Sequence, residues 1–338
     1  MQMTPSQRRF VPPPPSIVAA KAIEVRARGD FVDWLAASGG TLAVTTYNSG
    51  KLAFFSAAGV ELAASFWSFP RPMGVAGQGD RLALASREHI WVFQVNDGRL
   101  GVDAAYATGR LDGHDLAFDR RGLLFANTRF NCVARPSERV HFLRSWQPPF
   151  VTAAQRTDCC HLNGIGIRDG RLAVATAFCE SDSPKAWRQG DRFESGVAID
   201  VRENRVAVRG LCMPHSPRWH DGRWWFCDSG RGALGTLNLE GGDHTPMATL
   251  PGFTRGLTFA AGRAIVGLSR IRKRHILAAP PVRDRFSRLC SGVWLVDPST
   301  GRQTGALEFT RGGREVFDIA FLPWMLGEDL GMTALKSP

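Results

Sequence analysis

The sequence has 338 residues and a formal net charge of +11, and 44% of its residues are hydrophobic. This is the composition of a globular protein with a buried core, and it excludes a disordered chain. The positive charge is almost all arginine scattered through turn-like segments, so we expect no nucleic-acid partner. No apolar run is long enough to cross a bilayer and no signal segment is present, so we expect a cytoplasmic protein without a membrane partner.

The chain begins with a Pro-rich extension over residues 1–25, which includes four consecutive prolines. Six later segments share one plan, in which an apolar strand, a tight polar turn and a second apolar strand follow one another. These segments are 33–47, 73–86, 114–127, 163–176, 216–228 and 255–269. Their turns carry Asp-Gly, or Gly before Arg, which favours β-hairpins. The segments begin about 40 to 50 residues apart, which is typical of one four-stranded propeller blade.

Further strand-like runs at 90–94 and 292–297 supply outer strands for two of the blades. The run 316–322 comes after all six segments, so its simplest role is to complete the first blade and close the ring. Closure leaves no long unpaired strand edge. The sequence therefore predicts an all-β fold, a single six-bladed β-propeller domain over residues 26–325, followed by a C-terminal tail over residues 326–338.

In a propeller blade the turn between the first two strands lies on one face of the ring. The beginning of strand one and the end of strand two lie on the opposite face, where this sequence concentrates its polar residues. The longest irregular segments fall on that same face, and they are 129–140, 146–160, 178–196 and 270–289. Loops on a rigid scaffold commonly carry function. We therefore expect a site at this mouth of the channel, covered by these loops.

Three of the eight histidines, His114, His161 and His215, stand near the beginning of the inner strand in three different blades. Three imidazoles that converge on one axis suit a transition metal such as Fe, Cu, Zn or Mn. Ligating histidines usually have their second ring nitrogen held by a carboxylate or carbonyl. The candidate carboxylates are Asp115, Asp228 and Asp318. The alternatives are metal-free contacts with a ligand and hydrogen bonds between blades.

Arginines at the same mouth suit bidentate capture of a carboxylate or phosphate. The candidate substrate-binding residues are Arg129, Arg218, Arg231, Arg270 and Asn127, and Arg255 stands at the same mouth. The candidate catalytic residues are Asp115, Asp228 and Asn163. The arginines can equally pair with acidic residues, and the asparagines can equally cap strand ends. Cysteines near the mouth are either metal ligands, nucleophiles or small core residues, and they are Cys132, Cys160 and Cys290.

Two strings stand out as signatures. They are Cys-His-Leu-Asn-Gly at 160–164, and Met-Pro-His-Ser-Pro-Arg at 213–218 followed by Asp-Ser-Gly-Arg-Gly at 228–232. Together with His-Asp at 114–115, Asn-Thr-Arg-Phe at 127–130 and Gly-Leu-Ser-Arg at 267–270, they resemble an uncharacterised bacterial family that carries a domain of unknown function. The resemblance runs from about residue 30 to about residue 325, and it implies a propeller with a site at the mouth.

The architecture is more distantly similar to gluconolactonase-like and strictosidine-synthase-like six-bladed propellers, which place a metal or a catalytic group at the channel. Their usual calcium ligands are Glu, Asn and Asp, whereas this sequence offers histidines. It also lacks a G-x-S-x-G elbow, a phosphate-binding P-loop and an H-E-x-x-H zinc motif.

The leading functional hypothesis is a metal-dependent enzyme, with some preference for oxidoreductase chemistry, that acts on an anionic small molecule or peptide. A second hypothesis is a non-catalytic module that binds an acidic ligand or partner, because a propeller fold does not determine function. A third is a metal-free hydrolase or lyase, in which His161 and Asp228 act as acid and base.

Overall fold

The computed structural model describes residues 23–96, 99–152, 156–271, 280–325, 327–330 and 332–334. Most of the predicted N-terminal extension, residues 1–22, lies outside the described residues, as do parts of the predicted tail and residues 272–279 of the last predicted loop. Within the described residues no helix is both long and apolar enough to span a membrane.

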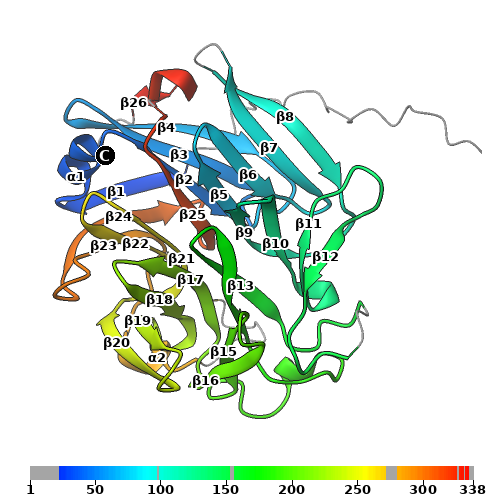
Figure 1. Cartoon of the computed structure of the whole chain (residues 1–338). Helices are drawn as coiled ribbons and strands as arrows, with labels where there is room; N and C mark the ends of the chain where they lie inside the picture. Colours follow the sequence, from blue (N-terminus) through cyan, green and yellow to red (C-terminus); the bar gives the residue numbers. More distant parts are fainter. Residues whose placement is uncertain are drawn as a thin grey trace, which may run out of the picture.

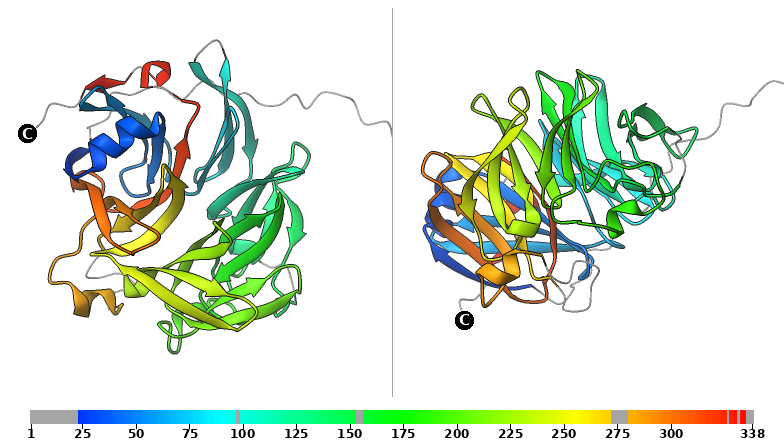
Figure 2. Two further views of the ribbon diagram at one scale, coloured as in Figure 1. Left: turned by 60° about the vertical axis from the view of Figure 1, so that its left-hand side comes forward. Right: turned by 90° about the horizontal axis from the view of Figure 1, so that it is seen from below.

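Six antiparallel sheets lie around a common axis, which confirms the predicted β-propeller (Figures 1 and 2). The strands of the first blade, from the axis outward, are β25 (Val316–Leu322), β2 (Thr41–Thr46), β3 (Lys51–Ala58), β4 (Glu61–Ser68) and β26 (Thr333–Ala334). The second blade is β5 (Val75–Gln78), β6 (Arg81–Ala85), β7 (His89–Asn96) and β8 (Arg99–Ala107). The third is β9 (Gly113–Asp119), β10 (Gly122–Asn127), β11 (Cys132–Arg135) and β12 (Leu143–Trp146).

The fourth blade is β13 (Leu162–Arg168), β14 (Arg171–Ala177), β15 (Gly196–Asp200) and β16 (Arg205–Leu211). The fifth is β17 (Pro214–His220), β18 (Arg223–Asp228), β19 (Ala233–Asn238) and β20 (Asp243–Thr249). The sixth is β21 (Phe253–Ala260), β22 (Arg263–Ser269), β23 (Gly292–Val296), β24 (Gln303–Arg311) and β1 (Glu24–Gly29). The described helices are short, and they are α1 (Phe31–Ser38), η1 (Thr128–Phe130), η2 (Ala186–Arg188), η3 (Ser229–Arg231), α2 (Val282–Arg285) and η4 (Gly327–Leu330).

The ring is closed from both ends of the chain. Strand β25 pairs antiparallel with β2, with Thr41 opposite Leu322, so the run 316–322 completes the first blade as predicted. Strand β1 pairs with the outer strand β24 of the sixth blade. Each of these two blades therefore combines strands from opposite ends of the sequence, which removes the edges that an open sheet would expose.

The predicted hairpin over residues 33–47 is wrong in its first half, because residues 31–38 form helix α1. Phe31, Trp34 and Leu35 follow the i, i+3, i+4 spacing of a helix face, and all three are buried. Gly39 ends the helix in the left-handed conformation, with φ of 65°, and its N–H donates to the Ala36 carbonyl. Short apolar runs fit a strand and a helix equally well, which is why periodicity failed here.

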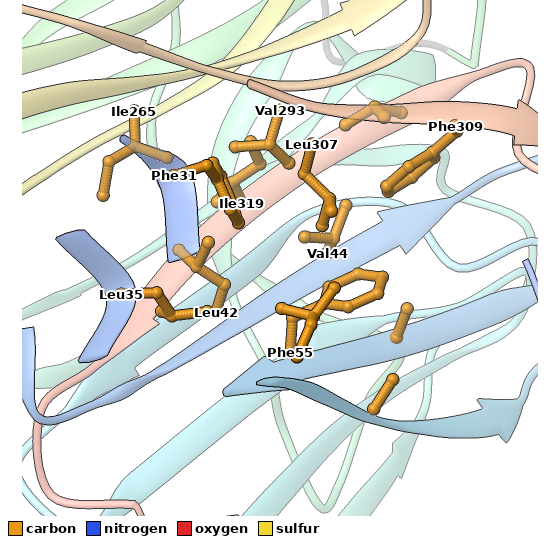
Figure 3. Packing of buried hydrophobic residues seen from close by; sticks show 14 of the residues in the cluster. Phe31, Leu35, Leu42, Val44, Phe55, Ile265, Val293, Leu307, Phe309 and Ile319 are labelled. Carbon is orange, nitrogen blue, oxygen red and sulfur yellow. The ribbon is translucent and has the colours of Figure 1, made fainter. Parts of the chain in front are cut away.

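Helix α1 packs into the apolar core between the first and sixth blades (Figure 3). Phe31 and Leu35 lie against Leu42 of β2 and Leu307 of β24 in one buried cluster. Phe31 is fully buried, and full burial of such a side chain contributes about 1.5–3 kcal/mol. The helix therefore seals the junction at which the two ends of the chain meet.

A buried ion cluster, consisting of Asp115, Arg218 and Asp318, bridges the blades across the channel. Arg218 of the fifth blade donates to both carboxylate oxygens of Asp115 of the third blade, at 2.9 Å each. Its guanidinium also donates to backbone carbonyls of the fourth and sixth blades, at 3.1 and 3.0 Å. Asp318 of the first blade lies 3.8 Å from Arg218 and accepts from the Val75 N–H of the second blade at 2.9 Å. All six blades are thus linked at the axis.

Candidate functional site

A cavity of about 290 Å³ opens at the mouth where the inner strands begin. Its walls come from the ends of strands and from loops of all six blades. The residues that line it include Asp112, His114, Asp158, His161, Phe178, Trp187, His215, Arg255, Arg270 and Phe317. A cavity of this size is close to the lower limit of small-molecule pockets, which is roughly 300 Å³.

Two of the three histidines are structural equivalents in the third and fifth blades. The Nδ1 atom of His114 lies 2.9 Å from the Asp112 carbonyl and 2.8 Å from Oγ1 of Thr128. His215 repeats the arrangement, with Nδ1 3.0 Å from the Met213 carbonyl and 2.8 Å from Oγ of Ser229. In each blade the carbonyl lies two residues before the histidine, and the hydroxyl follows the end of strand two. The repeat therefore orients both rings in the same way.

His161 occupies a different register, contrary to the expectation that the three positions match. It precedes β13 and has a left-handed backbone, with φ of 53°, whereas Asn163 takes the place that His114 has in its own blade. Its Nδ1 atom lies 3.1 Å from Oδ1 of Asp158. Asp158 also accepts the indole N–H of Trp187 at 3.0 Å. His161 and Asp158 therefore form a carboxylate–imidazole pair, which we call the His161–Asp158 pair.

Aromatic rings surround these imidazoles. The ring centroids of His161 and Trp187 are 4.2 Å apart, and those of His161 and Phe178 are 4.6 Å apart. Phe178 also contacts His215, at 5.3 Å. Burial lowers the pKa of His114 and of His215 well below the usual range, and repulsion from His161 and from the Arg255 guanidinium adds to the effect in both. Both rings are consequently neutral at pH 7.

Arg255 places a positive charge in the same cavity. Its guanidinium carbon lies 3.3 Å from the centroid of the Phe317 ring, and its Nη2 atom is buried without a hydrogen-bond partner. Burial lowers the pKa of Arg255 to about 10, and the carboxylates of Asp318 and Glu315 oppose that shift. The side chain therefore remains charged at neutral pH, with donors that the described residues do not use.

Arg270 is the predicted substrate-binding residue that lines the cavity. One guanidinium nitrogen donates to the Phe309 carbonyl at 3.3 Å and lies 3.7 Å from Glu308, while its Nε atom is buried without a partner. The other predicted arginines lie outside the cavity lining. Arg218 belongs to the ion cluster in the channel, Arg129 pairs with Asp112 at 2.6 Å, and Arg231 pairs with Asp228 at 2.8 Å.

The three predicted catalytic residues also lie outside the cavity lining. Asp115 is held by Arg218 and by the Ile165 N–H. Asp228 accepts from the Cys212 N–H at 2.6 Å and from Arg231. Asn163 is 1% exposed and accepts from Thr176, and Asn127 caps η1 by accepting from the Phe130 N–H. These contacts match the structural alternative, in which ion pairs and caps join neighbouring segments.

The cysteines near the mouth are not poised as thiolates. Burial raises the pKa of Cys132 to about 12 and raises the pKa of Cys160 and of Cys290 above the usual range. None of the three lines the cavity. A nucleophilic or metal-binding cysteine needs a lowered pKa, so these side chains act as small core residues.

The predicted metal does not fit the residues of the cavity. Across the described ranges, no group of three or more His, Cys, Asp or Glu side chains is arranged to hold an ion. His114 and His161 are close, with ring centroids 4.8 Å apart, but Phe178 contacts both His161 and His215. The charge of Arg255 also repels a cation and favours an anion. The transition metal itself stays a prediction.

Sequence reasoning missed Asp158 and did not single out Arg255 among the arginines of the mouth. Asp158 has no strand pattern around it, because it lies in the irregular segment before β13. The signal that could have found it is the spacing of three residues to His161. Arg255 was grouped with the other arginines at the mouth, although it is the third residue of an inner strand and His114 is the second residue of its own.

A family model described as "Domain of unknown function (DUF4915)" matches residues 29–327. The chain belongs to this family. No match was found among curated proteins.

Three solved structures show the same fold. A chain of a nidogen/laminin complex is 10% identical with a TM-score of 0.56, over 85% of this chain and 100% of that chain. A protein of unknown function from Bacteroides caccae is 10% identical with a TM-score of 0.55, over 84% and 99% of the two chains. A putative gluconolactonase is 14% identical with a TM-score of 0.52, over 85% and 88%. At these identities the likeness concerns the propeller alone.

Proposed function

We propose that the mouth cavity is the active site of a metal-independent enzyme that acts on a small anionic molecule. Arg255 and Arg270 bind the anion, and His161 transfers a proton. The unpartnered Nη2 atom of Arg255 carries the proposal. A buried guanidinium donor without a partner is costly, and a carboxylate or phosphate in the cavity removes that cost.

The His161–Asp158 pair supplies the acid–base group. Because the carboxylate accepts the Nδ1 proton, the imidazole presents the lone pair of Nε2 as a base. When Nε2 takes a proton, the carboxylate stabilises the imidazolium that forms. The rings of Phe178 and Trp187 pack on this imidazole and limit the access of bulk water.

Proton transfer of this kind serves hydrolysis or elimination. In hydrolysis, Nε2 of His161 takes a proton from water while the water oxygen bonds to a carbonyl carbon. The bond between the carbonyl carbon and the leaving oxygen then breaks while the imidazolium returns the proton to that oxygen, so no further reagent is needed. Because one similar structure is described as a putative gluconolactonase, lactones and esters that carry a separate free carboxylate or phosphate form the first assay panel.

The test compares hydrolysis of that panel by the parent and by His161→Gln, Arg255→Met and the control His220→Gln. His220 is the last residue of β17, at the opposite end of that strand from His215, and its ring stacks on Phe259. We expect kcat to fall about 100-fold or more in His161→Gln and KM to rise in Arg255→Met, with the control unchanged.

The same assays are repeated after treatment with a chelator. Retained activity is the expected result. Loss of activity that one added metal ion restores would contradict metal independence, and an unaffected His161→Gln variant would contradict the role of the His161–Asp158 pair.

A further inference from the structure

The hydrogen bonds of His114 fix which of its ring nitrogens carries the proton. The Asp112 carbonyl can only accept, so the Nδ1 atom that lies 2.9 Å from it must donate. The hydroxyl of Thr128 donates to the Leu162 carbonyl at 2.6 Å, so its lone pairs remain free to accept from the same Nδ1. The Nε2 atom of the neutral ring is therefore an acceptor.

His215 is fixed in the same way. Its Nδ1 donates toward the Met213 carbonyl, and the Ser229 hydroxyl directs its own proton toward the Cys227 carbonyl at 3.4 Å. His215 is 3% exposed and lines the cavity. No described residue donates a hydrogen bond to Nε2 of His114 or of His215. The cavity therefore holds two neutral acceptors beside the charged donors of Arg255.

Aromatic contacts leave little freedom for either ring to turn. His114 lies 5.3 Å from the Phe317 ring, and Arg255 covers that same ring at 3.3 Å. His215 lies between Phe178 and Phe253, at 5.3 and 5.6 Å. Since tilted and edge-on ring contacts and the bonds at Nδ1 hold both imidazoles, a ligand meets them at Nε2.

We propose that the ligand of this cavity is a hydroxylated anion, whose carboxylate or phosphate binds Arg255 and whose hydroxyl groups donate to Nε2 of His114 and His215. The anionic half of this inference rests on the proposed function, and the hydroxyl half rests on the two fixed tautomers. A bound analogue without hydroxyls covers these two acceptors without pairing them, which is the condition under which a site discriminates most strongly.

Calorimetric titration of the full chain with matched pairs of small anions tests the inference. Glycerate is compared with propionate, and glycerol 3-phosphate with propyl phosphate, so that the carboxylate and phosphate arms are separated. We expect the hydroxylated member of at least one pair to bind about tenfold more tightly or better. In His114→Phe and His215→Phe that preference shrinks toward one, while the affinity for the deoxy member changes little.

The outcomes separate this inference from the proposed function. If both members of each pair bind equally and this binding is lost in Arg255→Met, the anion site is supported and the hydroxyl preference is overturned. A preference that survives in both histidine variants would overturn it as well. If the parent binds no anion, both proposals are contradicted. If the histidine variants do not fold, the comparison of the matched pairs on the parent still tests the hydroxyl preference.

Discussion

The ion cluster in the channel makes a quantitative prediction about stability. The carboxylate of Asp115 is 3% exposed, accepts two charge-assisted hydrogen bonds from Arg218 at 2.9 Å, and accepts a third from the Ile165 N–H at 3.0 Å. Replacing it with asparagine keeps the volume but removes the charge that neutralises Arg218. Breaking a buried pair from one side costs about 3–5 kcal/mol.

Asp318 offsets part of that cost. Burial raises the pKa of Asp318 to about 7, and the neighbouring Asp115 charge is the next cause. Without the Asp115 charge, the pKa of Asp318 falls, so more of its carboxylate, 3.8 Å from Arg218, is ionised at neutral pH. We therefore expect Asp115→Asn to lower the free energy of unfolding by about 3 kcal/mol, at the lower end of the range.

Urea unfolding followed by tryptophan fluorescence measures this loss at pH 7.5. Asp169→Asn is the matched control, because Asp169 is 80% exposed and lies 3.6 Å from Arg168 in a surface pair. Surface pairs of this kind contribute little, so the control should match the parent. A loss below about 1 kcal/mol in Asp115→Asn would refute the reasoning that the cluster is a buried, charge-coupled link between blades.

Two further predictions concern titration. Because burial lowers the pKa of His215 in the folded state, the unfolded chain binds the proton first, and stability falls as the pH drops below about 6.5. Between pH 6.5 and pH 5, the free energy of unfolding of His215→Gln should fall less steeply than that of the parent, by about 1 kcal/mol per pH unit. An unchanged slope would contradict the lowered pKa of His215. The buried thiols with raised pKa, such as Cys132, should resist a thiol reagent in the native protein, and rapid labelling of that cysteine would contradict its burial.

The fold could be predicted from the sequence because each blade repeats the same local signals. Turn residues recur between apolar strands, and the surplus strand 316–322 had only one place in a closed ring. Helix α1 could not be predicted in this way. A short apolar run of this kind fits a strand as well as a helix. The helix is favoured because it lets Phe31 and Leu35 pack into the core between two blades.

The site was predictable in its place but not in its partners. The ends of the inner strands do gather His114, His161 and His215 around one cavity. The partners of the other polar side chains come from distant blades, and no local sequence pattern predicts such pairing. Arg218 reaches Asp115, which is 103 residues earlier, while the buried Nη2 atom of Arg255 has no hydrogen-bond partner among the described residues. Two arginines on the inner strands of neighbouring blades thus differ in role.

The thermal stability of Arg255→Met, measured with and without glycerol 3-phosphate, tests the central claim most directly. Methionine can still pack against Phe317, but it removes a buried guanidinium whose Nη2 atom has no hydrogen-bond partner among the described residues. The account predicts that the variant is at least as stable as the parent without ligand, and that it loses the stabilisation that the anion gives the parent. A variant that is less stable without ligand, yet gains as much from the anion as the parent does, would contradict the claim that Arg255 is the anion-binding residue of this cavity.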